Sequence, residues 1–242
     1  MNETRENGYL IHWYNLHEDI ESEYLEWLHE KYIPARLEDP RILWACHFKS
    51  LTNVEHPGEK GRLSHDNKSI PAGDRYILIF GSEKPSIFAD PTVAEYHQSL
   101  NQNDLAYLKM RCEERYNIMT EEARGPGSEE RPLDGAGLSE CIQLGNFNSG
   151  SYEDEDELAS WYATWRIPSM KKLPGCQGVR KLVSISGWAK HAILYEYRIS
   201  GTEHPLMAQN PTSRPVRFFH HYHGKKKWPS ETITKLKNKG TL

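Results

Sequence analysis

The sequence has few cysteines, and their spacing is not that of a zinc site or a disulfide framework. The four cysteines, at positions 46, 112, 141 and 176, form no CxxC pair. Three of them lie in or beside segments with strand character. We therefore expect reduced thiols in a packed core, and nothing in the pattern supports a catalytic cysteine.

Long hydrophobic runs and a strong excess of charge are also absent. No stretch approaches the ~20 apolar residues of a membrane helix, and the first residues, MNETRENG, are polar and lack the apolar core of a signal peptide. The formal net charge of −4 gives no general attraction to nucleic acid, and the basic run 225–227 is typical of a solvated tail. We expect a cytoplasmic protein with a small-molecule substrate and with no membrane or nucleic-acid partner.

Several catalytic fingerprints are missing as well. The chain contains no dinucleotide-binding glycine motif, no P-loop, no nucleophile elbow and no HExxH sequence. These absences disfavour nucleotide-driven chemistry and the familiar hydrolases.

An internal repeat is the strongest positive feature of the sequence. The stretch 23–50 and the stretch 157–184 align without a gap at an offset of 134 residues. Six positions are identical between them: Glu23/Glu157, Trp27/Trp161, Ile33/Ile167, Pro34/Pro168, Pro40/Pro174 and Ser50/Ser184. We interpret the chain as two copies of one structural unit.

Each copy predicts a strand, a helix and a second strand. Tyr24, Trp27, Leu28 and Tyr32 fall at helical spacing, and residues 158–165 repeat this apolar stripe. Ser151 and Asp154 predict a capping box at the start of the second helix. The Ile-Pro pairs predict that both helices end nearby. Further strands are expected at 9–16, 42–49, 74–80, 112–119, 141–148, 179–184, 188–198 and 216–223, with helical structure over 85–110.

The helix ends resemble a motif of the EthD-like branch of the dimeric α/β-barrel (ferredoxin-like) superfamily. That motif is similar to W-Y-D-x-E-H-[IV]-P followed by P-G-F. Here the matching stretches run from Trp27 to Pro34 and from Trp161 to Pro168, with Tyr32 and Arg166 in place of the histidine. The resemblance covers about 60 residues in its strong part and the rest by pattern only.

The resemblance implies a fold and a class of chemistry. The expected fold is α+β, with two tandem ferredoxin-like (βαββαβ-type) units forming a dimeric α/β-barrel-like arrangement within one chain. We expect the first unit at 1–120 with a long loop at 52–74, a linker at 121–137, the second unit at 138–224 and a basic tail at 225–242. The composition of the 52–74 loop fits a lid and a disordered excursion equally well. A homodimer is left open.

The function implied by the resemblance is cofactor-independent lyase or isomerase chemistry, such as decarboxylation, dehydration or cyclisation. The expected substrate is small, largely apolar and aromatic or polyketide-like, and histidine is the expected general acid/base. Two alternatives stay open: a non-catalytic small-molecule binder, and a cofactor-free or metal-dependent oxygenase of the same fold.

Histidines on predicted strands are the leading catalytic candidates. His12 lies between Leu10 and Tyr14 on one face of the first strand, and His221 and His223 share a face of the last strand. An HxH pair can bind a metal, but no carboxylate accompanies this one, so we expect no metal site. Core packing and a desolvated neutral base are the other two interpretations.

Other polar and aromatic groups complete the candidate list. Tyr32 and Arg166 could stabilise an anion in the active site, or could merely finish a helix stripe and pair with a carboxylate. The residues expected to contact substrate are Tyr14, Trp27, His47, Trp161, Tyr197 and Phe219.

Overall fold

The computed structural model describes residues 6–50, 69–129, 137–149, 151–198 and 218–221. The N-terminal half contains β1 (Gly8–Asn15), α1 (Glu21–Trp27), the π-helix η1 (Leu28–Tyr32), α2 (Ile33–Leu37), β2 (Ile42–Ser50), β3 (Tyr76–Ser82), the 3₁₀ turn η3 (Pro85–Phe88), α3 (Val93–Ser99), α4 (Gln102–Leu108) and β4 (Cys112–Pro126). The C-terminal half contains β5 (Cys141–Phe147), α5 (Asp154–Trp161), the π-helix η4 (Tyr162–Arg166), α6 (Ile167–Ser169), the 3₁₀ turn η5 (Met170–Lys172), β6 (Cys176–Ser186), β7 (His191–Tyr197) and β8 (Phe218–His221).

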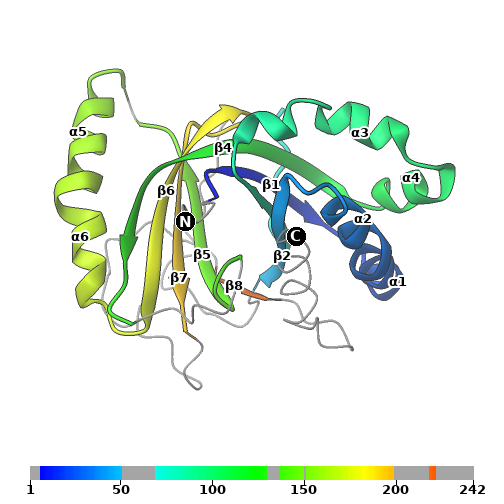
Figure 1. The fold of residues 1–242 in the computed structure, drawn as a ribbon, viewed down its shortest axis with the longest axis horizontal. Coiled ribbons are helices and arrows are strands. Elements are labelled where there is room, and N and C mark those ends of the chain that lie inside the picture. Colours follow the sequence, from blue (N-terminus) through cyan, green and yellow to red (C-terminus); the bar gives the residue numbers. More distant parts are fainter. Residues whose placement is uncertain (1–5, 51–68, 130–136, 150, 199–217, 222–242) are drawn as a thin grey trace, which may run out of the picture.

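The strands form a closed antiparallel barrel in the order β1-β3-β2-β8-β5-β7-β6-β4. Within each half the order is the same: the fourth strand pairs with the first, the first with the third and the third with the second. The halves join where β4 pairs with β6 and where β2 pairs with β8. Figure 1 shows α1–α4 on one side of the barrel and α5–α6 on the opposite side. The observed architecture is therefore the expected α+β barrel within one chain.

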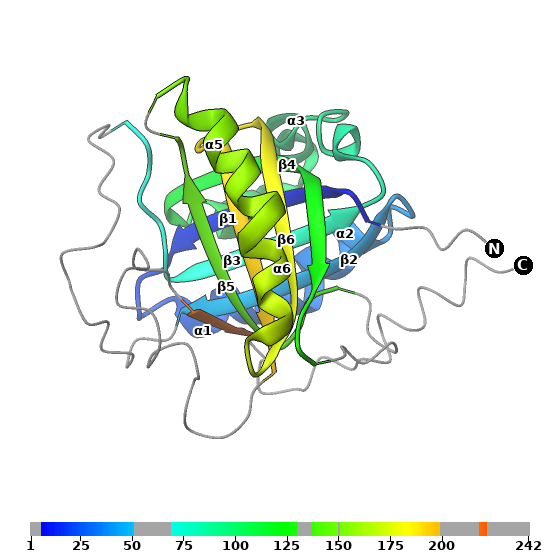
Figure 2. The same cartoon turned by 90° about the vertical axis from the view of Figure 1, so that its left-hand side faces the viewer.

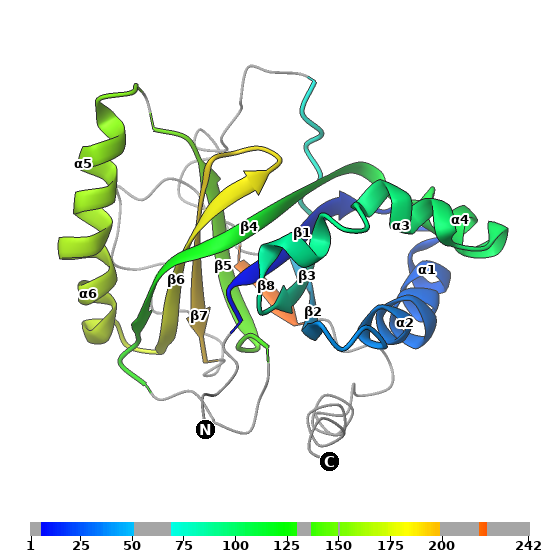
Figure 3. The same cartoon turned by 45° about the horizontal axis from the view of Figure 1, so that its top comes forward.

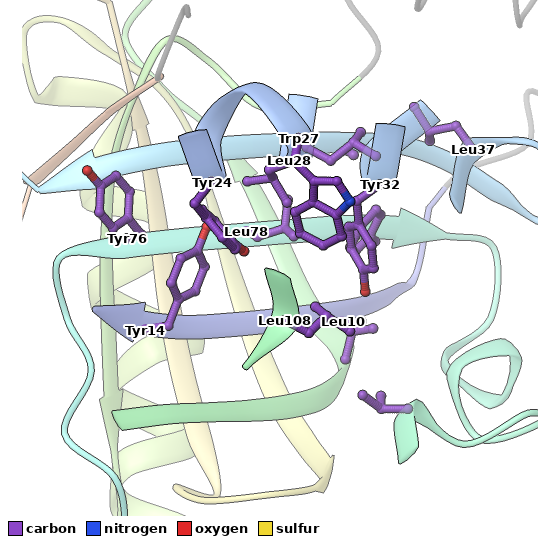
Figure 4. Packing of buried hydrophobic residues seen from close by; sticks show 14 of the residues in the cluster. Leu10, Tyr14, Tyr24, Trp27, Leu28, Tyr32, Leu37, Tyr76, Leu78 and Leu108 are labelled. Carbon is purple, nitrogen blue, oxygen red and sulfur yellow. The ribbon is translucent and has the colours of Figure 1, made fainter. Parts of the chain in front are cut away.

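Strand alternation divides the buried side chains into three layers. The barrel interior holds residues from both halves, including Ile11, Trp44, Ile79, Leu144 and Leu194. A second layer packs the outer sheet face of the first half against its helices, and a third does the same in the second half. Leu10 and Tyr14 share one face of β1, as predicted, and this face points to the helices (Figure 4).

The repeat motifs have matching backbone structure in the two halves. The π-helices η1 and η4 and the strands β2 and β6 begin at positions that differ by 134 residues. Figure 2 shows α5 and α6 as a continuous rod over the outer face of the second sheet. The reciprocal bonds of the predicted capping box are present, from Asp154 N to Ser151 Oγ and from Ser151 N to Asp154 Oδ2.

Three expectations differ from the observed elements. The helices continue past the Ile-Pro pairs as α2 and α6, because Pro34 and Pro168 lie in the first turn of a new α-helical segment, where a missing N–H costs little. The helix expected at 85–110 is divided into η3, α3 and α4. Strand β4 extends to Pro126, so the first residues of the expected linker are paired with β6. Figure 3 shows β4 reaching across both halves.

Candidate active site

Polar side chains gather between the sheet and the helices of the first half, a layer that is otherwise apolar. We call this group the first-half cluster; it comprises His12, Tyr14, Tyr24, His29, Tyr32, His47, His97, Arg111 and Glu114. Figure 4 shows Tyr24 and Tyr32 of this cluster beside Trp27, with Tyr14 next to Tyr24, between the strands and the helix. Buried polar groups of this kind are retained only when they are hydrogen-bonded or have a function.

His12 and Glu114 form a buried histidine–carboxylate pair. Nδ1 of His12 lies 2.9 Å from Oε1 of Glu114, and the imidazole is fully buried. Burial lowers the pKa of His12 although the bond to Glu114 opposes it, so the neutral ring donates its Nδ1–H to the carboxylate. Nε2 then carries the lone pair, and it has no hydrogen-bond partner among the described residues. This is the arrangement of an oriented general base.

Arg111 balances the charge of Glu114 and joins it to the aromatic side chains. Its Nη1 donates to Glu114 Oε1 over 2.6 Å, and its Nε donates to the Tyr24 hydroxyl over 2.5 Å. The guanidinium also lies over the Tyr14 ring, 4.6 Å from its centroid. Burial alone would raise the pKa of Glu114, but Arg111 and His12 hold it well below its usual range. The carboxylate therefore stays ionised and keeps the His12 tautomer fixed.

Two partly exposed rings cover His12. The His97 ring stacks on it with centroids 6.4 Å apart, and the Tyr116 ring lies at 5.7 Å. Burial lowers the pKa of His97 to about 4, with His12 as a further cause. The Tyr32 hydroxyl lies 3.3 Å from Nε2 of His97, and burial raises the pKa of Tyr32. Both side chains are thus neutral at pH 7, able to donate or accept a hydrogen bond.

A second set of hydrogen bonds connects strands β1 and β2 to the π-helix η1. The Tyr14 hydroxyl lies 2.8 Å from Nε2 of His47, and Nδ1 of His47 lies 2.8 Å from Nε2 of His29. The extra residue in a π-helical turn re-aims side chains, and such turns are frequent at functional sites. Here η1 carries both His29 and Tyr32. Tyr14–His47–His29 is a short chain along which hydroxyl and ring protons can shift together.

In the layer between the sheet and the helices of the second half, polar groups form small separate groups. The buried Arg180 faces the other way and bonds Glu196, Glu6 and Tyr9, a residue of the barrel interior. Arg166 Nε donates to the Tyr195 hydroxyl over 2.7 Å, and the Tyr197 hydroxyl donates to Gln143 over 3.3 Å. Lys181 bonds Glu122 on the outer face of the sheet. These groups are small and scattered, so among the described residues this layer contains no histidine–carboxylate–arginine cluster like that of the first half.

The structure brings together only part of the predicted site. His12, Tyr14, Tyr32 and His47 lie in the first-half cluster, and Trp27 packs beside them. The remaining predicted residues lie elsewhere: Arg166 and Tyr197 in the layer of the second half, and Trp161 on the outer side of its helix. For Phe219 and His221 the structure describes only the backbone, which belongs to β8. His223 lies outside the described residues.

Five members of the cluster were not predicted: Tyr24, His29, His97, Arg111 and Glu114. Arg111 and Glu114 flank the start of β4, where the sequence CEERYN has no alternation of apolar residues to mark a buried face. His97 lies on α3, in a region where the helical periodicity is broken. A signal did exist for His29, because it lies three residues before Tyr32 on the same helix and so shares its face. Among the described residues no three histidine, cysteine or carboxylate side chains are grouped as metal ligands.

Comparisons with known proteins give a fold but no sequence family. No protein-family profile and no curated protein sequence matches the chain. An anthrone oxidase-like protein of known structure has a TM-score of 0.53 and 8% identity, over 92% of this chain and 93% of its own. A candidate monooxygenase from Lactobacillus acidophilus NCFM has a TM-score of 0.48 and 12% identity, over 89% of this chain and 93% of its own.

At such low identity a structural match shows the fold alone, and here that fold is the dimeric α/β barrel. The match to the anthrone oxidase-like protein spans both halves, in agreement with the closed barrel. Within the described residues no helix is long and apolar enough to span a membrane.

Proposed function

We propose that the chain is an enzyme whose first half holds the active site, with His12 as the general base. The observation that carries this proposal is the buried imidazole whose Nδ1–H is fixed by Glu114 and whose Nε2 has no partner among the described residues. An unbonded buried nitrogen costs about 1–3 kcal/mol, and His191 of the second half also has one, at Nδ1. His12 differs from it because its carboxylate is held by the buried Arg111 and because Tyr32 and His97 lie nearby.

The reaction starts with proton removal from a small aromatic or polyketide-like substrate. Nε2 of His12 takes a proton from a C–H next to a carbonyl or from a phenol, and the electron pair stays on the substrate as an enolate or phenolate. The resulting imidazolium is stabilised by ionised Glu114, while Tyr32 and Arg111 stabilise the substrate anion. Since His12 is fully buried, the substrate reaches it only after His97 or Tyr116 rotates aside.

Oxygenation is the outcome that we favour for this anion. The name of the anthrone oxidase-like neighbour supports it, as a proposal for this chain. A carbanion at a CH₂ group adds O₂, the peroxide anion takes the proton of the His12 imidazolium, and loss of the second C–H proton with hydroxide yields a ketone and water. In the lyase or isomerase alternative the same anion is reprotonated or expels a leaving group without O₂.

We further propose that the two halves arose from one duplicated ferredoxin-like unit, at about 1–120 and 138–224. Their common strand order and the π-helices at the same repeat position support this. The burial of the repeated tryptophans differs, since Trp27 is buried and Trp161 is 42% exposed. In the first half α4 covers the helix, with Tyr107 stacked on Trp27 at 5.0 Å.

The test measures proton exchange and O₂ uptake on the same protein. With anthrone or a similar enolisable aromatic ketone, we expect the chain to accelerate deuterium exchange from solvent under anaerobic conditions and to consume O₂ in air. His12→Ala should abolish both, while His191→Ala in the second half should leave both intact. Exchange without O₂ uptake would support a lyase or isomerase. Binding with neither activity would support a non-catalytic binder and contradict the proposal.

A further inference from the structure

The helix of the second half carries an exposed aromatic pair. Trp161 is 42% and Trp165 56% exposed, and their rings stack with centroids 5.4 Å apart. Adjacent exposed tryptophans are unusual on a monomer surface and are typical of the core of a protein interface. In the first half the equivalent Trp27 is covered by α4, where Tyr107 stacks on it and Asp104 accepts its indole N–H over 2.7 Å.

Charged residues lie on the same side of this helix, acidic toward one end and basic toward the other. The exposed positions that we consider, at spacings of three and four residues, are Asp154, Glu157, Trp161, Trp165, Pro168 and Lys172. The stacking of Trp161 on Trp165 shows that this spacing keeps neighbours on one side also through the π-helix η4, so the six positions form one stripe. We call these six residues the α5–α6 stripe. Figures 1 and 2 show α5 and α6 on the outside of the sheet, with no described helix beyond them.

The stripe is close to symmetric about residue 163. When two copies pack antiparallel about a two-fold axis at this point, Trp161 of one copy meets Trp165 of the other, and Asp154 meets Lys172. A two-fold interface requires such self-complementarity, because the same patch serves on both subunits. The charge order excludes a parallel pairing, which would place acid against acid and base against base.

We propose that the α5–α6 stripe is a homodimer interface in which two copies of this chain pair antiparallel through stacked tryptophans. The surface lies on the opposite side of the barrel from the first-half cluster (Figure 1), so dimerisation leaves the proposed active site open. A single helix pair is at the small end of specific interfaces, so the dimer is expected to form in the micromolar range. The proposal is independent of the enzymatic activity.

Sedimentation equilibrium of the full chain, from about 1 to about 200 μM, tests the interface. The weight-average mass should rise from the monomer value of 28.1 kDa toward twice that value. Trp161→Ser with Trp165→Ser should raise Kd at least about 30-fold, because buried tryptophans are typical interface hot spots. Glu38→Lys, a charge reversal at an exposed position of the first half, should leave Kd unchanged.

A charge exchange distinguishes this pairing from nonspecific association of exposed tryptophans. Asp154→Lys alone and Lys172→Glu alone should each weaken the dimer about tenfold, since like charges then face each other. The double variant restores opposite charges across the two-fold axis, so its Kd should return to within about threefold of the original. Circular dichroism of each variant checks that the helix is retained.

Each other outcome overturns the proposal. A chain that is monomeric throughout, with tryptophan fluorescence quenched by acrylamide, has no such interface. If the monomer shields Trp161 and Trp165 from the quencher, another part of the same chain covers them. Dimers that are insensitive to the tryptophan and charge variants use a different face.

Discussion

The two halves share a backbone plan, but they differ in what lies between sheet and helices. In the first half this layer contains a charged dyad, a buried arginine and a histidine–tyrosine chain. In the second half the same layer contains cysteines, aliphatic residues and isolated polar pairs. The same backbone plan therefore holds a polar cluster in one half and a mostly apolar layer in the other, and a few side chains decide which of the two forms.

Particular repeat positions show how the halves diverge. At the offset of 134 residues, Ala163 stands opposite His29, Arg166 opposite Tyr32 and Lys181 opposite His47. Replacing His29 by alanine removes the end of the hydrogen-bonded chain. Replacing His47 by lysine puts a fixed cation where the first half has a ring that can shift its proton. The second half therefore has no histidine at the positions that correspond to His47 and His29 of the Tyr14–His47–His29 chain.

The second half does contain one histidine–carboxylate pair, which provides a matched control. Nε2 of His191 lies 2.9 Å from Glu155, a residue that also accepts hydrogen bonds from Lys190 and Ser149. The bond to Lys190 is the largest cause that lowers the pKa of Glu155 to about 2. This carboxylate is shared by three groups at the start of α5, whereas Glu114 is held by Arg111 within a cluster of titratable side chains. Since His191 is buried and its Nδ1 also has no partner among the described residues, it tests whether a histidine–carboxylate pair alone is enough for activity.

Replacing the two paired histidines gives the largest expected difference between the halves. His12→Ala should lower kcat by about 10²- to 10⁴-fold, the usual contribution of a general base. His191→Ala should lower it less than about twofold. The measurement is the rate of deuterium exchange or O₂ uptake, with thermal melts to confirm that both variants fold. Equal losses in the two variants would contradict the assignment of the site to the first half.

Replacing the repeated tryptophans, Trp27 and Trp161, compares the two halves through the free energy of unfolding. Trp27→Ala should lower the free energy of unfolding by about 3–5 kcal/mol, because it leaves a cavity and removes the indole hydrogen bond to Asp104. Trp161→Ala should cost clearly less, about 1–2 kcal/mol in dilute solution, because 42% of this residue is already exposed. Urea titrations at low protein concentration measure both values. A similar loss in the two variants would mean that Trp161 is covered within the monomer.

Much of the fold was accessible from the sequence because hydrophobic periodicity reports directly on burial. The strands at 9–16, 42–49 and 141–148 were placed within one or two residues, since their apolar residues alternate or run continuously. The π-helices were not predicted, because over five residues the α-helical period of 3.6 residues and the π-helical period of about 4.4 residues give almost the same pattern. The end of β4 was missed because Glu121, Glu122 and Arg124 are typical of a linker, although each is paired in the structure.

Only about half of the candidate site could be predicted from the sequence, again because of what hydrophobic patterns can report. His12, Tyr14, Tyr32 and His47 could be found because they interrupt apolar segments. Arg111 and Glu114 could not, since their burial depends on each other and on His12, which the sequence places 99 and 102 residues away. Burial that depends on distant charges neutralising each other cannot be predicted from the hydrophobicity of the residues nearby in the sequence.

The buried tyrosine hydroxyls allow a finer comparison of the two layers. Tyr14→Phe should lower the free energy of unfolding by about 1–2 kcal/mol, because it removes the hydrogen bond to buried His47. Tyr195→Phe should cost less than about 1 kcal/mol, since Arg166 is partly exposed and water can replace the hydroxyl. Chemical denaturation of the two variants gives the difference. A larger loss for Tyr195→Phe would show that the second layer depends more strongly on its polar contacts.

The smallest expected effect is a pH dependence of stability that comes from the first half. Burial lowers the pKa of His97 from 6.5 to about 4 and also lowers that of His12. The unfolded chain therefore binds more protons than the folded chain below pH 6.5, so stability falls as the pH falls from about 6.5 toward 4. Glu114 does not interfere, because a carboxylate with a lowered pKa loses its contribution to stability only below its ordinary pKa of 4.5.

Because His97 is partly exposed, we expect the free energy of unfolding to be about 1 kcal/mol lower at pH 5 than at pH 7. His97→Gln should reduce this difference, and an unchanged difference in the His97 variant would mean that its ring is hydrated in the folded protein.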